Sequence, residues 1–228
     1  MLAEQRHALC EVLALITIYV GRIVAVGLNP EGKAAALYRI SSRSFPNRTA
    51  ILGADRVSVV PKEGFVQDVF KNPYITYNAI QVVGDVVVVS NGSHTNPIAE
   101  KLASGMGIRD ALAYSLLGLD YEHDSLDTPR IAGVIKRGGG NAYLGIIRKD
   151  KLHVAEVQLQ PGELAYLSTY ERNDVDPAQR EAFAATDPIG AAQTMLSAGV
   201  FAGMTHPVLA TCALETGDGF VFAKHDVE

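Results

Sequence analysis

The stretch NAIQVVGDVVVVS, residues 78–90, decides the fold class of this chain. Two apolar runs, Asn78–Val83 and Val86–Ser90, flank Gly84-Asp85, and a two-residue turn of this type predicts a β-hairpin. The second run contains four consecutive valines, which predict a strand buried on both faces of its sheet. Such a strand requires a layer of structure on each side of that sheet.

Short runs of the same β-type, separated by turn residues, make up most of the chain on both sides of this hairpin. The cluster Asn29-Pro30-Glu31-Gly32-Lys33 predicts a second hairpin between the first two of them. The further predicted strands are Tyr19–Val26, Ala34–Arg39, Val57–Val60, Arg130–Ile135, Tyr143–Ile147, Leu152–Gln158, Leu164–Thr169, Val208–Leu214 and Gly219–Ala223.

Helical patterns are fewer and fall in two places. Asn96 is the expected N-cap of the first helix, with Pro97 in its first turn. Hairpins combined with two pairs of helices, and no alternation of strand and helix, indicate the α+β class. We expect one domain, a four-layer αββα sandwich of two stacked antiparallel sheets with helices outside. The predicted helices are Ile98–Ser104, Ile108–Leu119, Pro177–Ala185 and Pro188–Ala198.

The composition excludes several classes of protein. Of the 228 residues, 48% are hydrophobic and 20% charged, an ordinary globular composition that excludes a disordered chain and a coiled coil. The formal net charge of −5 argues against a general nucleic-acid binder and against a protein that binds anionic membranes. Cys10 and Cys212 form no CxxC pair and no disulfide framework, which fits a protein of the reducing cytoplasm.

Residues 1–17 need a separate interpretation because they are apolar from Ala8 onward. Glu4 and Glu11 interrupt this stretch, no small-residue cleavage site follows it, and it is too short to span a bilayer. We therefore expect an N-terminal extension, as a short extra helix or an over-long start, followed by a single domain over residues 18–228. No later stretch is apolar for long enough to predict a transmembrane helix.

The most unusual window is Gly32–Ala54, which contains Lys33, Arg39, Arg43 and Arg48 and no acidic residue. Its polar loop, SSRSFPNR, directly follows a predicted strand. Guanidinium groups combined with hydroxyl and backbone N–H groups are suited to binding a phosphate or a carboxylate. The alternative is a solvated loop whose arginines pair with surface carboxylates.

Two more polar clusters lie on either side of the valine strand. Ser90–Asn96 precedes a predicted helix, where free backbone N–H groups favour an anion, although ordinary capping with a satisfied His94 is equally consistent. Ser93 and His94 are not expected to form a nucleophile–base pair, because neighbours in an extended chain point to opposite faces. Asn72–Asn78 is suited to binding a heteroaromatic base, with Tyr77 able to donate a proton, or to packing at a sheet edge.

A run of acidic residues, Asp120–Asp124 with Asp127, follows the last turn of a predicted helix. The helix dipole disfavours negative charge there, so a compensating role is expected. A calcium loop is excluded because its sixth position is not glycine, and one histidine is too few for a metal cage. We expect one of these carboxylates to act as a general base, and we predict no metal site and no cofactor.

Short motifs along the chain also occur in a characteristic order. They are YVGR (19–22), RISSRSFPNR (39–48), NPYITYN (72–78), VSNGSHT (89–95), RDA (109–111), DYE (120–122) and TPR (128–130). Together they resemble the archaeal-type IMP cyclohydrolases from about Ile18 onward. The resemblance implies an αββα fold like that of the N-terminal-nucleophile hydrolases, without their self-processing or their nucleophile. It also implies closure of 5-formamidoimidazole-4-carboxamide ribotide to IMP with loss of water, the last step of purine synthesis.

The resemblance assigns catalytic roles to three residues. Arg48 is expected to polarise the oxygen that gains charge, and Tyr77 to assist proton transfer to the departing hydroxyl. Glu122 is expected to act as the general base or to hold the amide in its reactive form. The expected partner is the nucleotide substrate, with no nucleic acid and no membrane, and a homo-oligomer is expected. The expected substrate-binding residues are Arg22, Arg43, Asn72, Asn91, Ser93 and His94.

Two other functions remain open from the sequence. A non-catalytic module that binds purine nucleotides would use the same scaffold, and in it Glu122 and Tyr77 would be replaceable without consequence. A self-processing amidohydrolase would need cleavage before Cys10 or Thr17 to expose a nucleophile. Turnover separates the first from the cyclohydrolase, and the mass of the purified chain tests the second.

Overall fold

The computed structural model describes residues 18–139 and 142–227 and contains two antiparallel β-sheets. The first sheet has the strand order β11 (Arg180–Ala182), β10 (Glu163–Ser168), β1 (Arg22–Leu28), β2 (Ala34–Ser41), β12 (Pro207–Thr216) and β13 (Gly219–Asp226). The second follows the chain through β3 (Arg48–Leu52), β4 (Arg56–Pro61), β5 (Tyr77–Val83), β6 (Val86–Ser90), β7 (Arg130–Lys136), β8 (Ala142–Arg148) and β9 (Lys151–Val157).

The hairpin predicted at residues 78–90 is present as β5 and β6, near the middle of the second sheet and joined at Gly84-Asp85. Val87 and Val89 have no exposed surface and pack in the core between the two sheets. Val88 points to the other face, where it packs against the helices. The prediction of a strand buried on both faces is confirmed.

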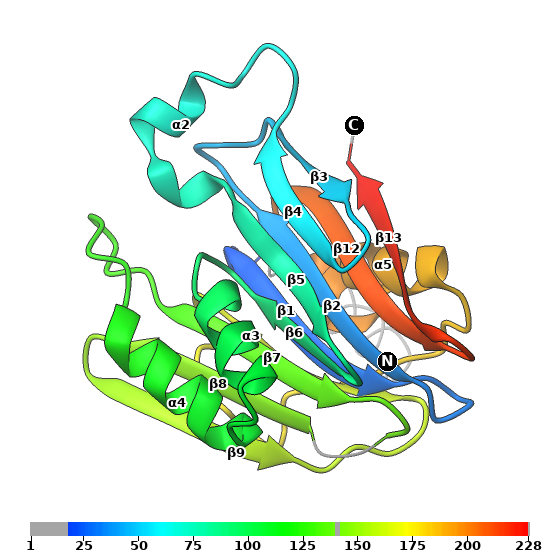
Figure 1. Cartoon of the computed structure of the whole chain (residues 1–228). Helices are drawn as coiled ribbons and strands as arrows, with labels where there is room; N and C mark the ends of the chain where they lie inside the picture. The colour runs from blue at the N-terminus through cyan, green and yellow to red at the C-terminus, as the bar shows by residue number, and fades with distance from the viewer. Residues whose placement is uncertain (1–17, 140–141, 228) are drawn as a thin grey trace, which may run out of the picture.

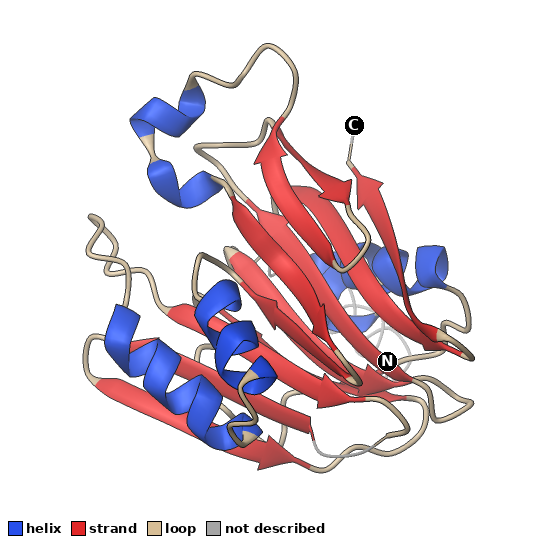
Figure 2. Ribbon diagram, viewed as in Figure 1, coloured by secondary structure: helices blue, strands red, loops and turns tan. Residues whose placement is uncertain are grey.

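Helices cover the outer face of each sheet (Figure 1). α3 (Thr95–Ala103) and α4 (Ile108–Leu119) pack on the seven-stranded sheet, whereas α5 (Pro188–Ser197) and the 3-10 helix η2 (Gly199–Gly203) pack on the six-stranded sheet. A large apolar core fills the space between the sheets, and a smaller one lies under each helical layer. Figure 2 shows the strands in the middle and the helices outside them. The predicted α+β sandwich of two antiparallel sheets is therefore confirmed.

The helix predicted at Pro177–Ala185 is wrong. This segment forms a turn and the short edge strand β11, whose backbone pairs with β10. Phe183 is fully buried in the core under α5. The contacts with β10 and the burial of Phe183 therefore override the helical propensity of the alanine-rich sequence.

The start of α3 also differs from the prediction. The helix begins at Thr95 with His94 as its N-cap, so Asn96 lies inside the first turn. The side-chain oxygen of Asn96 accepts a hydrogen bond of 2.8 Å from Asn78 on β5. This contact with the sheet replaces the capping role expected from the Asn96-Pro97 pair.

Several short elements are present that the sequence pattern does not predict. Strand β3 forms the edge of the second sheet and begins at the last residue of the SSRSFPNR loop. The connection between β4 and β5 carries α2 (Asp68–Lys71) and the 3-10 helix η1 (Pro73–Ile75). Figure 1 shows this connection extending away from both sheets.

Among the helices of the described ranges, none combines the length and apolarity needed to cross a bilayer. The N-terminal extension expected at residues 1–17, and Cys10 with it, lies outside the described residues. Cys212 is a buried free thiol, and burial raises its pKa to about 12, so it is unreactive.

Arg39 is fully buried and has a structural role. Its Nη1 donates to the carbonyls of Met195 and Phe201, each at 2.8 Å, and its Nη2 donates to that of Met204 at 2.6 Å. Its Nε donates to Ser41 at 3.1 Å. Burial lowers the pKa of Arg39 to about 10. The guanidinium thus ties β2 to carbonyls at the end of α5 and around η2.

Arg39→Met is expected to destabilise the protein by roughly 3–5 kcal/mol, because buried carbonyls lose their donor while side-chain volume is kept. Urea unfolding followed by circular dichroism measures this loss. Lys33→Met, in the same basic window, is the control and is expected to change stability by less than about 0.5 kcal/mol. Equal unfolding midpoints for the two variants would contradict the structural role of Arg39.

Candidate active site

Glu122 lies in the loop after α4, and 2% of its side chain is exposed. The loop turns inward at Asp120, the C-cap of α4, which has a φ of 57°. The N–H of Glu122 donates to the carbonyl of Thr128 at 2.8 Å. Its carboxylate lies between two guanidinium groups: Oε2 is 3.4 Å from Nη2 of Arg22 on β1, and Oε1 is 3.5 Å from Nη1 of Arg130 on β7.

This environment favours proton uptake by Glu122. Burial raises the pKa of Glu122 above its ordinary value, and the nearby Arg22 and Arg130 offset only part of the rise. Burial disfavours the charge on Arg22, but the Glu122 carboxylate and nearby phenols outweigh it and raise the pKa of Arg22. Oε1 of Glu122 is buried without a hydrogen-bond partner in the described part of the chain. A carboxylate in this state is suited to act as a general base.

Two tyrosines from opposite sheets meet near Arg22, which pairs with this carboxylate. The hydroxyl of Tyr77 on β5 lies 2.5 Å from the hydroxyl of Tyr38 on β2, and their rings meet edge to face at 6.3 Å. Burial, together with the neighbouring Tyr77, raises the pKa of Tyr38 well above its ordinary value. Both phenols lie close enough to Arg22 for their charges to interact. A proton can therefore pass from the hydroxyl of one tyrosine to that of the other.

Arg48 completes this buried group. It is the first residue of β3, it is 3% exposed, and its Nε donates to the carbonyl of Phe45 at 3.1 Å. Burial lowers the pKa of Arg48, and the nearby Tyr77 opposes that change. No carboxylate of the described residues forms an ion pair with it, although its charge also acts on Glu122. Its positive charge is therefore available to an oxygen that becomes negative. Arg22, Tyr38, Arg48, Tyr77, Glu122 and Arg130 are called the buried cluster below.

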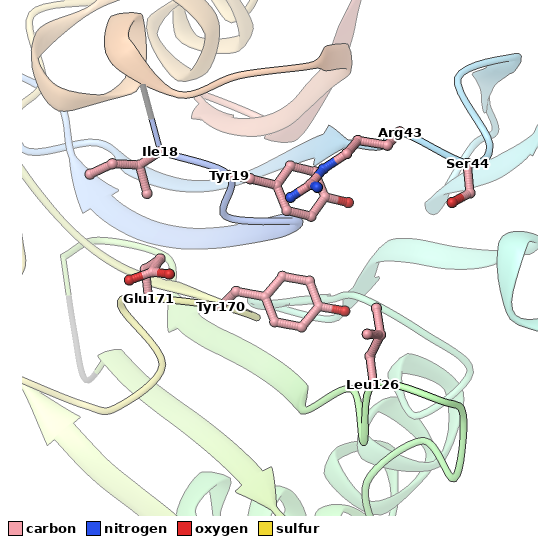
Figure 3. Close-up of a pocket in the computed structure, with 7 residues that line it drawn as sticks. All are labelled: Ile18, Tyr19, Arg43, Ser44, Leu126, Tyr170 and Glu171. Atoms are coloured by element: carbon pink, nitrogen blue, oxygen red, sulfur yellow. The ribbon is translucent and has the colours of Figure 1, made fainter. Parts of the chain in front are cut away.

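A cavity of about 800 Å³ adjoins the buried cluster, a volume suited to a small-molecule ligand. In Figure 3 the side chain of Arg43 lies against the ring of Tyr19, with Tyr170 on the other side of that ring. The guanidinium carbon of Arg43 is 3.9 Å from the centre of the Tyr19 ring, and the rings of Tyr19 and Tyr170 stack at 5.9 Å. The lining residues are Ile18, Tyr19, Arg43, Ser44, Leu126, Tyr170 and Glu171.

Tyr170 connects the cavity to the buried cluster. Its hydroxyl lies 2.9 Å from the hydroxyl of Thr128, whose carbonyl accepts the N–H of Glu122. The charges of Tyr170 and Arg22 interact. Arg48, Tyr77 and Glu122 are not among the described residues that line the cavity. Tyr170 and Thr128 therefore form the link between the cavity wall and Glu122.

Backbone strain is concentrated around the same place. In the described ranges the non-glycine residues with positive φ are Asp120, Asp127, Glu171 and His206. Two of them flank the loop of Glu122, Glu171 lines the cavity, and the ring of His206 meets that of Tyr19 edge-on at 6.0 Å. Left-handed backbone at such residues costs energy and is often found at functional sites.

The structure separates the expected substrate-binding residues into two groups. Asn91 and His94 are fully buried, and their side chains hydrogen-bond to backbone groups of residues 129–131. Ser93 is exposed, and Asn72 accepts a backbone hydrogen bond as the cap of η1. The remaining two, the arginines at positions 22 and 43, lie at the buried cluster and at the cavity. No group of His, Cys, Asp or Glu within residues 18–139 and 142–227 is arranged to hold a metal ion.

A family model described as IMP cyclohydrolase-like protein matches residues 19–219. The chain belongs to the IMP cyclohydrolase-like family. The matched residues include the whole buried cluster and every residue lining the cavity except Ile18. The site built from the geometry therefore lies inside the part of the chain that the family shares.

Three relatives show how similar the chain is to curated proteins named IMP cyclohydrolase. The chain is 43% identical over 196 residues to the IMP cyclohydrolase of Methanosphaera stadtmanae, covering 86% of this chain and 94% of that protein. It is 53% identical over 156 residues to that of Methanocella arvoryzae, covering 68% and 75%. The IMP cyclohydrolase of Methanothrix thermoacetophila is 40% identical over 210 residues, covering 92% and 99%.

Several residues of this family site go beyond the sequence prediction. Tyr38 follows directly on Leu37 in a strand, so alternation places it on the face toward the other sheet, where a polar group needs a partner. Arg130 is the last residue of the TPR motif and the first residue of β7. Tyr19 and Tyr170 come from distant segments and form one wall only in the folded chain.

Proposed function

We propose that this protein is an IMP cyclohydrolase, which closes 5-formamidoimidazole-4-carboxamide ribotide to IMP with release of water. The observation that carries the proposal is the buried cluster, in which a carboxylate with one oxygen that accepts no hydrogen bond lies near a guanidinium without an ion pair in the described residues and a phenol pair. The names of the archaeal relatives support the same reaction.

In the first step the carboxamide nitrogen attacks the formyl carbon, and negative charge develops on the formyl oxygen. Arg48 stabilises that oxygen, and Glu122 accepts the proton that leaves the carboxamide nitrogen. The formyl oxygen takes up a proton through the Tyr77 hydroxyl, and Tyr38 replaces the proton of Tyr77. The product of this step is a cyclic carbinolamine that bears one hydroxyl group.

In the second step the hydroxyl leaves as water. The departing hydroxyl takes the proton that Glu122 holds, and the nitrogen that carried the formyl group gives its proton to the Tyr38–Tyr77 pair. The substrate nitrogens lose two protons in all, water carries away two, and Glu122 and the two tyrosines return to their starting states. Much of the acceleration comes from holding the two reacting groups of one substrate against each other.

The phosphate end of the substrate is assigned to Arg43. Its guanidinium lies at the open cavity and forms no ion pair with a carboxylate of the described residues, whereas Arg22 and Arg130 face Glu122. The ring of Tyr19 orients it. An arginine of this kind matches the geometry of a phosphate.

Arg43→Met is expected to raise the KM for the ribotide by roughly 10- to 100-fold with little change in kcat, because a charged hydrogen bond to the phosphate is lost. Inhibition by IMP is expected to weaken by a similar factor, while inhibition by inosine, which lacks the phosphate, is unchanged. Arg56→Met, at an exposed site on β4, is the control. An equal loss for IMP and inosine would exclude Arg43 as the phosphate ligand.

The proposal also covers the fold type, the domain arrangement, the oligomeric state and the cellular location of the enzyme. The order of layers supports a fold of the N-terminal-nucleophile hydrolase type that works without self-processing. Residues 18–228 are proposed to form one catalytic domain after an extension at residues 1–17, in a homo-oligomer of the cytoplasm, where nucleotides are made.

Formation of IMP, followed by absorbance after mixing the purified chain with the formamido ribotide, tests the proposal. We expect a rate far above the uncatalysed closure. Binding of IMP in a calorimeter without turnover would instead support a non-catalytic nucleotide-binding module and overturn the proposed activity.

A further inference from the structure

Two buried acceptor atoms without a hydrogen-bond partner in the described residues lie beside one guanidinium group, that of Arg130. They are Oε1 of Glu122 and Nδ1 of His94. Oε1 lies 3.5 Å from Nη1 of Arg130. Nδ1 and that same Nη1 both lie close to Gly92. A Cβ built on this glycine would be 3.0 Å from Nη1 and 3.3 Å from Nδ1. Buried acceptors without partners are rare in folded proteins and require an explanation.

His94 is a neutral histidine with its lone pair on Nδ1. Its Nε2 lies 2.9 Å from the carbonyl oxygen of Ile131, a contact that requires the proton on Nε2. Burial, assisted by the positive charge of Arg130, lowers the pKa of His94 to about 3. The ring has no exposed surface. It therefore presents an acceptor, and no charge, toward the guanidinium of Arg130.

Arg130 is held by a hydrogen bond at Nε and by a longer ion pair with Glu122 at Nη1. Its Nε donates to the carbonyl of Asp120 at 2.8 Å. Asp120 caps the C-terminus of α4, where the helix dipole favours a cation. The ring of Tyr74 lies 5.7 Å from the guanidinium carbon. Because Nε is held by this hydrogen bond, a movement of the guanidinium shifts Nη1, which lies near Oε1 of Glu122 and near the side of Gly92 that Nδ1 of His94 faces.

We propose that Arg130 is a positioning residue whose Nη1 alternates between Glu122 and His94 during turnover. While Glu122 is ionised, its charge attracts Nη1. Once Glu122 has taken the proton from the substrate amide, that attraction falls, and Nδ1 of His94 accepts the N–H of Arg130. Nη1 returns when Glu122 gives up the proton. The inference rests on the proposed function, because it concerns the two states of Glu122 in that reaction.

The proposal gives opposite effects for the two neighbours of Glu122. Without the acceptor at His94, Arg130 pairs with Glu122 alone and makes it a weaker base. Without the cation at Arg130, Glu122 holds its proton to higher pH. The other charged groups that act on Glu122, which are Arg22 on β1, Arg48 on β3 and Asp124 in its own loop, are the same in both cases.

The test is the pH dependence of kcat for the full chain and its variants. We expect the acid limb to move up by about one pH unit in Arg130→Gln and down by about half a unit in His94→Leu. KM is expected to stay within about twofold, since the proposal gives neither side chain a contact with the substrate. His94→Gln, which restores a buried acceptor, is expected to return the limb toward its wild-type position.

A second measurement needs no substitution. Nitrogen-15 NMR of the histidine-labelled wild-type chain is expected to show one ring that carries its proton on Nε2 from about pH 5 to about pH 9. A proton on Nδ1 of that ring, an unmoved acid limb in His94→Leu, or shifts of both variants in one direction would overturn the inference and leave the proposed function intact. Absence of turnover in the wild-type chain would overturn both.

Discussion

Glu122→Gln is expected to lower kcat for IMP formation by about 10²- to 10⁴-fold, because the amide cannot accept the proton that leaves the substrate nitrogen. The shape of the side chain is kept, and one of the two guanidinium groups that face it keeps an oxygen to contact. We therefore expect the variant to bind IMP with an affinity close to that of the wild type. Steady-state kinetics and calorimetry on the same preparation measure the two quantities.

The matched control for this change is Asp127→Asn. Asp127 lies in the same loop, its side chain is 44% exposed, and it pairs with Lys149 at the surface. Asparagine tolerates the left-handed backbone found there. The control is expected to keep wild-type turnover. A Glu122→Gln variant with unchanged kcat would remove Glu122 from the mechanism.

Arg48→Met is expected to lower kcat by about 10²- to 10³-fold, the usual cost of removing one donor that stabilises a developing oxyanion. KM is expected to change much less, because the charge on the oxygen appears only in the transition state. Folding is expected to be kept or strengthened, because the variant no longer buries an unpaired cation. Kinetics and urea unfolding together separate the catalytic role from a structural one.

Two comparisons sharpen this prediction. Arg48→Lys keeps the charge but loses the contact of Nε with the Phe45 carbonyl, so an intermediate loss of kcat is expected. Arg56→Met, on the neighbouring strand and 45% exposed, is expected to leave kcat unchanged. Equal kcat in Arg48→Met and Arg56→Met would contradict the assigned role.

Much of the fold can be predicted from residues 78–90, because four adjacent valines next to a two-residue turn favour a strand covered on both faces. The hairpins follow from turn residues that act within a few positions of each other. Pro177–Ala185 shows where this reasoning ends. Its alanine content favours a helix, and only the exposed edge of β10 and the burial of Phe183 make it a strand.

The site is harder to predict because its members come from distant segments. The basic window Gly32–Ala54 shows this most clearly. Its arginines have different roles because they lie at different places, on strands or in the loop between them. Arg39 points under α5 and holds carbonyls, Arg43 lies at the cavity, and Arg48 is buried beside the tyrosine pair. The net charge of −5 describes the surface, whereas the buried cluster combines three arginines with one glutamate. Composition alone cannot report that difference.

Proton NMR of the formamido ribotide during incubation with the purified chain tests the central claim most directly. The claim predicts that the formyl proton signal is replaced, at a rate far above that of the protein-free sample, by the ring proton of IMP. No free formate is expected, because the formyl carbon stays in the product. Release of formate, or a formyl signal that decays no faster than without protein, would contradict the account.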